Sequence, residues 1–466
     1  MPTESRPSIP PLSARAVALS VLVESVKSDE GVDLLLDRQL APHPFDPRER
    51  GLALELTYGV LRRQGTVDWR LTPILDKPLF RLPVLVQMIL RLGAYQILFL
   101  DRIPESAAVN ESVQLVKRHG NILGRDWSAL VNAVLRQLIR QPAPDWPDMN
   151  LNPAESLSVR YSVPEWLSRR WVERFGVTTA ASVCEQSSGI PPLTIRVNRC
   201  KMNRDSYINQ LREAGIAAAP TTISTMGIRV EGSGAVQTMP GYEKGLFYVE
   251  DEAAQLIPPL LDPQPGDRIL DACAAPGGKA THLAELVGEK GLILALDRKE
   301  SRLDLLRSNC QRLGLKNVRP IVGDARQTSW RRAIESEALS VDRVLVDAPC
   351  SGLGVLRRHP DAKWRKDSLS FDRHQRLQRQ ILESVATCLR PGGVLVYSTC
   401  STESEENEAV VEKFLSAHAE FRRESVAPWL PAAAHKLVSQ LGDFSTMGNP
   451  ASMDYFYAVR LTKASS

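Results

Sequence analysis

The sequence predicts an α/β protein in which a parallel sheet flanked by helices follows an all-α domain and a small α+β module. From Gly266 onward, short runs of β-branched and aliphatic residues alternate with helical segments. This alternation is typical of βαβ units, whose strands are buried on both faces and are therefore apolar throughout. We expect strands at residues 268–272, 292–296, 318–322, 344–346 and 394–397.

Two regions precede this predicted sheet. Between residues 12 and 141, apolar side chains recur at intervals of three and four, which predicts helices at 14–26, 48–63, 84–100, 106–117 and 127–139. After a proline-rich linker, helical segments (165–175, 205–214) mix with strand-like ones (193–197, 227–230). We therefore expect an all-α domain at 1–142, an α+β module at 150–240 and the α/β domain at 241–466, in agreement with typical domain sizes of about 100 to 200 residues.

Composition excludes several classes of protein. With 43% hydrophobic and 24% charged residues, the chain is neither disordered nor fibrous. Residues 1–11 lack an apolar core, so no secretory signal is expected. The longest apolar run, 84–100, contains Gln87, Arg91 and Gln96, which favours a buried helix over a membrane span. We expect a cytoplasmic protein.

The cysteine pattern and the net charge limit the kinds of binding site that the sequence can contain. Seven cysteines show neither a CxxC pair nor a ligand spacing with histidine, so we expect free thiols and no metal. The net charge is only +4, so nucleic-acid binding must depend on local basic patches. One such patch lies at residues 353–380, where eight basic residues are interleaved with Trp364 and two histidines, a pattern that suits phosphate contacts and base stacking. Its alternative is an ordinary solvated helix face.

The first predicted strand leads into the turn Asp271-Ala-Cys-Ala-Ala-Pro-Gly-Gly-Lys279, after which a helix is expected. Small residues and free amide groups at a helix start allow a ligand to approach the backbone closely. Asp297, 20 residues after Gly277, ends the second strand, where a carboxylate can bind ribose hydroxyls. Asp324 and Asp347 follow the third and fourth strands. The alternative interpretation of the two glycines is a tight turn between strand and helix. For each aspartate it is a helix cap or an acid in a solvated loop.

The nature of the cofactor follows from what this turn lacks. It contains neither a GxGxxG fingerprint nor a Walker lysine, which disfavours NAD and ATP. A nucleoside without phosphates fits better, and S-adenosylmethionine is such a ligand.

Two cysteines, Cys350 and Cys400, follow the fourth and fifth predicted strands. Because neighbouring strand ends meet at one edge of a sheet, we expect both thiols over the same cleft. A thiolate that adds to C6 of cytosine activates C5 for methylation, but a free thiol is only a few per cent ionised at pH 7. Lys279 or the sulfonium cation can favour the thiolate. Small buried hydrophobes are expected at the other positions outside the turn, Cys184, Cys200, Cys310 and Cys388.

These segments resemble the RNA cytosine-C5 methyltransferases. The resemblance is carried by Asp271–Lys279, Asp347-Ala-Pro-Cys-Ser-Gly352, Arg357-Arg-His-Pro-Asp361 and Ser398-Thr-Cys400. Further similar segments are Arg196-Val-Asn198, Val249-Glu-Asp-Glu-Ala-Ala-Gln255 and Met453-Asp-Tyr-Phe-Tyr457. In the helical region, Tyr58-Gly-Val-Leu-Arg62 and Val131-Asn-Ala-Val-Leu-Arg136 look like a NusB-type RNA-binding domain. The chain departs from the family at Leu353, where threonine is common, and at Tyr455, where glycine is common.

The resemblance implies a Rossmann-like S-adenosylmethionine methyltransferase fold and a set of site residues. Cys400 would be the nucleophile and Cys350 would aid product release, with Asp347 and Lys279 beside them. Cofactor contacts are implied at Cys273, Ala274, Ala275, Pro276, Gly277, Gly278, Lys279, Asp297, Asp324 and Asp347.

The implied substrate is 16S ribosomal RNA, methylated at C5 of one cytosine, with cytosine 967 as the expected nucleotide. The α+β module would contact this RNA, and a monomer is expected. Extruding a base from a duplex costs a few kcal/mol, which favours free RNA or an early assembly intermediate over a finished subunit. Two alternatives stay open: the same chemistry on transfer RNA, and a NusB-like RNA-binding assembly factor whose methyltransferase domain is inactive.

Overall fold

The computed structural model describes residues 13–28, 30–42, 45–232, 234–334, 340–366, 370–447 and 453–465. The chain forms two compact units, one of Met1–Ile190 with Leu356–Lys366 and the other of Pro191–Val355 with Asp367–Ser466. The expected limits of three domains at 142, 150 and 240 stay a prediction, because this division into two units does not test them. Residues 1–11, where no secretory signal is expected, lie outside the described part of the chain.

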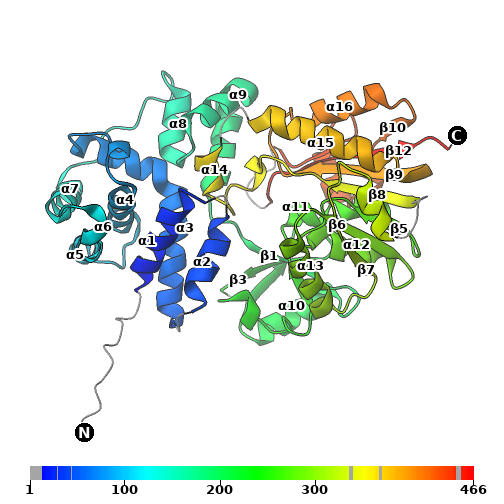
Figure 1. The fold of residues 1–466 in the computed structure, drawn as a ribbon, viewed down its shortest axis with the longest axis horizontal. Helices are drawn as coiled ribbons and strands as arrows, with labels where there is room; N and C mark the ends of the chain where they lie inside the picture. Colours follow the sequence, from blue (N-terminus) through cyan, green and yellow to red (C-terminus); the bar gives the residue numbers. More distant parts are fainter. Residues whose placement is uncertain are drawn as a thin grey trace, which may run out of the picture. The chain divides into compact units, whose positions relative to one another are not determined.

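The first unit is helical (Figure 1). Its helices are α1 (Ala14–Ser25), α2 (Val32–Leu40), α3 (Pro47–Leu71), α4 (Val84–Phe99), α5 (Glu105–Arg118), α6 (Gly120–Leu123), α7 (Ser128–Arg140), α8 (Pro153–Tyr161), α9 (Glu165–Ser188) and α14 (Ala362–Arg365). Local chemistry sets their starts. Asp46 accepts the backbone N–H groups of Arg48 and Glu49, and Pro47 occupies the first turn of α3. The five helices predicted for the first domain are confirmed.

The core of this unit depends on close helix packing. Almost every residue of α4 from Val86 to Gln96 is buried. Its Gly93 allows two other helices to approach, since a Cβ there would lie 2.6 Å from both a Leu135 methyl group on α7 and the Ser112 hydroxyl on α5. The buried helix predicted for the apolar run 84–100 is therefore confirmed.

Helix α9 contains a break that agrees with the expected end of the segment 165–175. Gly176 has a φ of +75°, a conformation that favours glycine, and a second helical stretch continues to Ser188. The sequence prediction covered the first half of α9 and missed the second, together with α8.

Part of the predicted basic patch is buried in the helical unit. Lys363 is fully buried, and its ammonium group donates to the carbonyl of Arg62 at 3.1 Å. Trp364 donates its indole N–H to the carbonyl of Leu61 at 2.8 Å, and only 4% of Arg357 is exposed. Burial lowers the pKa of Lys363 to about 7. The expectation that the whole patch faces RNA is therefore wrong for Arg357 and Lys363.

The second unit begins with a small antiparallel sheet. Its strands are β1 (Leu193–Val197), β2 (Ala217–Pro220), β3 (Gly227–Glu231) and β4 (Phe247–Val249), in the order β2-β3-β1-β4. Helix α10 (Arg204–Glu213) packs on this sheet through Tyr207, whose ring stacks on Phe247 with centroids 5.8 Å apart. The predicted strands 193–197 and 227–230 are confirmed, whereas β2 and β4 were not predicted.

The larger sheet carries the chemistry-bearing segments. Its strands are β5 (Arg268–Asp271), β6 (Leu292–Asp297), β7 (Val318–Val322), β8 (Val341–Asp347), β9 (Leu389–Thr399), β10 (Phe421–Glu424), β11 (Phe444–Ser445) and β12 (Tyr457–Lys463). The order is β10-β12-β9-β8-β5-β6-β7, with β11 beside β12. Strands β5 to β9 are parallel, whereas β12 runs antiparallel to β9, so the sheet is mixed.

Helices cover both faces of this sheet (Figure 1). They are α11 (Glu252–Gln255), α12 (Gly278–Val287), α13 (Glu300–Leu313), α15 (Ser370–Ala386) and α16 (Glu408–Ala417). Ile269 packs in the core with α12 and α13, and the next residue, Leu270, packs in the core with α15 and α16. This alternation is the period of two expected for a strand buried on both faces.

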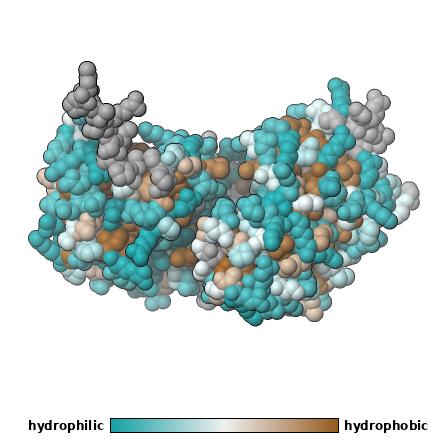
Figure 2. Space-filling view, turned by 90° about the horizontal axis from the view of Figure 1, so that it is seen from below, coloured by the Kyte–Doolittle hydropathy of each residue, from teal (hydrophilic) through white to brown (hydrophobic). Residues whose placement is uncertain are grey.

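The surface is mainly hydrophilic on the face drawn in Figure 2, where apolar residues form separate small patches. Within the described residues, no helix combines the length and the apolar character that a membrane span requires. The same residues contain no cluster of three or more side chains suited to hold a metal ion.

Candidate active site

The strand order of the large sheet reverses between β5 and β8, because β6 and β7 extend it on one side and β9 on the other. In open α/β sheets, ligands bind beyond the carboxyl ends of the strands at such a point. The turn after β5 and the loops after β8 and β9 all lie at these ends. These are the segments in which the sequence analysis placed the cofactor turn and the two thiols.

Two glycines shape the turn between β5 and α12. Gly277 has a φ of +114°, and a Cβ there would lie 2.5 Å from a methyl group of Leu306. A Cβ on Gly278 would lie 2.9 Å from Oε1 of Glu250. The segment therefore forms a tight turn, and it brings the backbone amide groups at the start of α12 to the edge of the sheet.

The three strand-end acids have different surroundings. Asp297 is buried and accepts the N–H of Ala275 in the turn at 3.3 Å, so it adjoins the predicted cofactor site. Asp324 is more exposed and pairs with Arg326 of its own loop, which holds the pKa of Asp324 below its usual value. The ion pair with Arg326 within the loop is therefore enough to explain the position of Asp324.

Asp347 pairs with the lysine of the turn. Lys279 Nζ lies 2.6 Å from Asp347 Oδ2, and the Ser398 hydroxyl donates to Oδ1 at 2.8 Å. Burial alone would lower the pKa of Lys279, but the attraction of Asp347 and Glu250 raises it above its ordinary value. The ammonium group therefore remains charged, which brings a fixed positive charge to the edge of the sheet.

The two strand-end thiols lie side by side. Cys350 Sγ and Cys400 Sγ are 3.4 Å apart, and both cysteines are free and partly buried. The hydrogen bond with Cys400, followed by burial, raises the pKa of Cys350 well above its ordinary value. Cys350 therefore keeps its proton and can donate it in a hydrogen bond to Cys400 Sγ.

Two acids of this region were not assigned a role from the sequence. Burial, followed by repulsion from Asp347, raises the pKa of Asp271 at the end of β5 to about 7. Glu406 is fully buried and accepts the backbone N–H of Ser351 at 2.7 Å. The strand-end rule that selected the other acids also fits Asp271. No sequence signal identifies Glu406, because its position depends on the course of the loop after β9.

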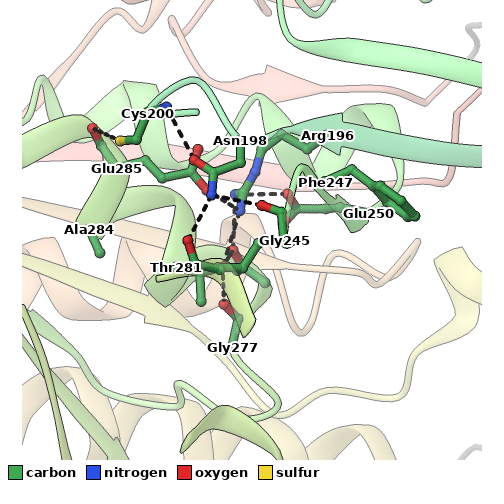
Figure 3. Close-up of polar contacts among 12 residues, drawn as sticks. Arg196, Asn198, Cys200, Gly245, Phe247, Glu250, Gly277, Thr281, Ala284 and Glu285 are labelled. Carbon is green, nitrogen blue, oxygen red and sulfur yellow. Dashed lines mark hydrogen bonds and ion pairs between the residues drawn. The ribbon is translucent and has the colours of Figure 1, made fainter. Parts of the chain in front are cut away.

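A buried arginine ties the small sheet to the cofactor turn (Figure 3). Arg196, on β1, donates to the Gly278 carbonyl and to the Thr281 hydroxyl, each at 3.1 Å. It also pairs with Glu250 at 3.2 Å and with Glu285 at 3.1 Å. Burial raises the pKa of both carboxyls, and the guanidinium charge opposes this. Arg196 thus has a structural role at the start of α12.

Replacing Arg196 by methionine should strongly destabilise the second unit. The change leaves two buried carboxyls without their cation, and breaking such a cluster costs about 3–5 kcal/mol. Chemical denaturation of the full chain measures this loss. Arg229→Met is the matched control on the same sheet, since this arginine is half exposed and pairs only with Glu231 at 3.5 Å among the contacts described for it. Equal unfolding free energies for the two variants would contradict the prediction.

The remaining cysteines divide into two groups. Cys184, Cys310 and Cys388 are buried, as expected. Cys200 is exposed, so its expected role as a buried hydrophobe is wrong. It comes directly after Arg199 in the turn following β1, where the chain has left the core. Cys273 lies at the start of the cofactor turn, and burial raises its pKa well above the ordinary value.

Comparison with known proteins identifies three family segments. Residues 258–462 match the 16S rRNA methyltransferase RsmB/F model, 12–140 match the NusB family, and 163–237 match an RsmF/B-like ferredoxin-like domain. The expected combination of an all-α NusB-like domain, a small α+β module and a Rossmann-like methyltransferase domain is confirmed.

Similar proteins extend over nearly the whole chain. A probable ribosomal RNA small subunit methyltransferase B of Synechocystis is 36% identical and covers 97% of this chain and 100% of its own length. Ribosomal RNA small subunit methyltransferase B of Pseudomonas syringae is 35% identical and covers 87% of this chain and 86% of its own length. The crystal structure of PH0851 superposes with a TM-score of 0.81 at 26% identity and covers 98% of this chain and 100% of its own.

Proposed function

We propose that this chain, which belongs to the 16S rRNA methyltransferase RsmB/F family, methylates C5 of one cytosine of 16S ribosomal RNA through a covalent bond between Cys400 and C6. The observation that carries the proposal is the pair of thiols 3.4 Å apart beyond β8 and β9. A second thiol beside a nucleophilic one suits a reaction in which a covalent adduct must first form and then be released.

S-adenosylmethionine is the cofactor. When bound, it supplies the methyl group on a sulfonium. The chain offers a turn whose two glycines leave no room for side chains, and the buried Asp297 borders that turn. Asp271 Oδ2 is buried without a hydrogen-bond partner, which suits a site that a polar ligand completes. We infer that Cys273 to Lys279, Asp297 and Asp347 hold the cofactor, and that Asp324 adds to the site from the loop after β7.

The chain's own groups account for the covalent chemistry. Cys400 adds as a thiolate to C6, and the electrons of the C5–C6 double bond become available at C5. C5 then takes the methyl group and loses its proton to a water molecule. The electrons of the C5–H bond re-form the double bond, the C6–S bond breaks, and Cys400 leaves as a thiolate. Lys279, which remains charged beside Asp347, stabilises negative charge during the addition. Cys350, which remains protonated, stabilises the departing thiolate.

We further propose that the RNA is free or part of an early assembly intermediate, that cytosine 967 is the target, and that the protein acts as a cytoplasmic monomer. Arg373 and Arg376 are exposed on α15 and remain candidates for phosphate contacts. Transfer of labelled methyl groups to free 16S RNA, assembled subunits and transfer RNA, followed by mapping of the modified base, tests the substrate. Labelling of transfer RNA alone would favour that alternative. The absence of any transfer, together with no thermal shift at saturating cofactor, would favour an inactive assembly factor.

Replacing Asp297 by asparagine should weaken cofactor binding about tenfold, because a charge-assisted hydrogen bond to a ribose hydroxyl becomes a neutral one. Isothermal titration with S-adenosylmethionine in the absence of RNA measures the dissociation constant. Asp304→Asn, an exposed substitution on α13, serves as the control and should bind as the unmodified protein does. Equal affinity in the Asp297 and Asp304 variants would contradict a ribose contact.

A further inference from the structure

One buried carboxylate joins the two loops that carry the thiols. Glu406 Oε1 accepts the N–H of Ser351 at 2.7 Å, and Oε2 accepts the hydroxyl groups of Ser351 and Ser401. The two hydroxyl oxygens are themselves 3.1 Å apart. Ser351 follows Cys350 directly and Ser401 follows Cys400 directly. A single side chain therefore holds the immediate neighbours of both thiols.

The carboxylate is fixed from further sides. The Tyr397 hydroxyl, on β9, donates to the backbone carbonyl of Glu406 at 2.5 Å. From α15, His374 Nδ1 lies 3.3 Å from Oε1, and the amide group of Gln378 donates to the carbonyl of Pro349 at 3.0 Å. Pro349 precedes Cys350, so α15 restrains the same loop. Because Glu406 is fully buried, it depends on these donors and cannot turn toward solvent.

We propose that Glu406 is a positioning residue that sets the separation of the Cys350 and Cys400 thiols and thereby controls release of the methylated RNA from Cys400. This inference rests on the proposed function, in which Cys350 assists that release. The thiols are not covalently joined, so their 3.4 Å separation must be maintained by the loops around them. Without the carboxylate, the N–H and the two hydroxyl groups lose their shared acceptor, and the loops can move apart.

The separation of the thiols can be tested without RNA or cofactor. Diamide oxidises two adjacent thiols to a disulfide by accepting two electrons and two protons, so the rate of Cys350–Cys400 cross-linking reports their proximity. Mass spectrometry of the linked peptides follows this rate. We expect Glu406→Ala to lower it at least about fivefold, whereas Glu406→Gln stays within about twofold, because an amide offers both an acceptor and donors at the same place. An unchanged rate in Glu406→Ala would overturn the inference.

A second readout follows the reaction itself. The fraction of enzyme covalently bound to RNA, measured on denaturing gels after quenching, should rise at least about fivefold in Glu406→Ala, because the release step loses its aligned thiol. Glu406→Gln should restore a low fraction. If Glu406→Ala does not fold, the double variant Ser351→Ala/Ser401→Ala decides, because it removes both hydroxyl groups and leaves the carboxylate in place. Ser416→Ala, an exposed change on α16, is the control.

The outcomes separate this inference from the proposed function. If Cys350→Ala accumulates the covalent complex and none of the Glu406 and serine variants does, the positioning role is refuted and the proposed function stands. If Cys350→Ala also accumulates no complex, the proposed release step fails. The cross-linking rate then still decides whether Glu406 sets the separation of the thiols.

Discussion

Replacing Cys400 by alanine is expected to abolish methyl transfer, with a loss of at least about a thousandfold, because addition to C6 has no other thiolate to perform it. Cys350 is a poor substitute, because burial still raises its pKa after the hydrogen bond with Cys400 is lost. Lys279 and Asp347 remain in place but form no covalent bond to the base in the proposed reaction. Incorporation of labelled methyl groups into 16S RNA measures the loss.

The control for this prediction must separate chemistry from folding. Cys388→Ala removes a buried thiol at the opposite end of β9, and it should retain activity within about twofold because Cys388 has no proposed chemical role. The Cys400 variant should still show a thermal shift with S-adenosylmethionine. If it retains more than about a tenth of the activity, Cys400 is not the nucleophile.

The positions of the five parallel strands could be predicted because burial on both faces leaves a clear pattern, whereas the antiparallel strands β10, β11 and β12 were not predicted. Residues 318–322 coincide with β7, and the other four runs lie on β5, β6, β8 and β9. Strand β2 was missed because its sequence, Ala217-Ala-Ala-Pro220, contains no residue that favours a strand. It forms only because β3 supplies hydrogen-bond partners. Pairing between segments distant in sequence cannot be predicted from local composition.

The difference between local sequence patterns and contacts between distant segments also explains which parts of the site could be predicted. The proximity of the two thiols follows from one rule, that residues after neighbouring parallel strands meet. The position of Lys279 beside Asp347 was implied only by the family resemblance. Glu406 and Arg196 do not follow from this rule, because a loop and a separate module bring them to the site. Lys363 was misjudged for a related reason. A lysine in a basic stretch is usually solvated, but this one is buried against the carbonyl of Arg62, about 300 residues away in sequence.

Replacing Cys350 by alanine should increase the amount of covalent complex, whereas replacing Cys400 should prevent the complex from forming. The C6–S bond breaks only if the departing sulfur can carry negative charge, and the S–H group of Cys350, 3.4 Å away, is placed to stabilise that charge. A hydrogen bond to a charged group contributes about 1.5–3 kcal/mol, so release should slow by about ten- to a hundredfold. Methyl transfer within the first turnover should continue.

The protein should therefore accumulate as a complex with RNA that survives denaturing electrophoresis and carries the labelled methyl group. The double variant Cys350→Ala/Cys400→Ala must form none, since the bond to RNA is made by Cys400. A complex in the double variant would assign the bond to another residue. Its absence in the single variant, with normal turnover, would mean that release needs no second thiol, and the 3.4 Å approach of the two sulfur atoms would then require a different explanation.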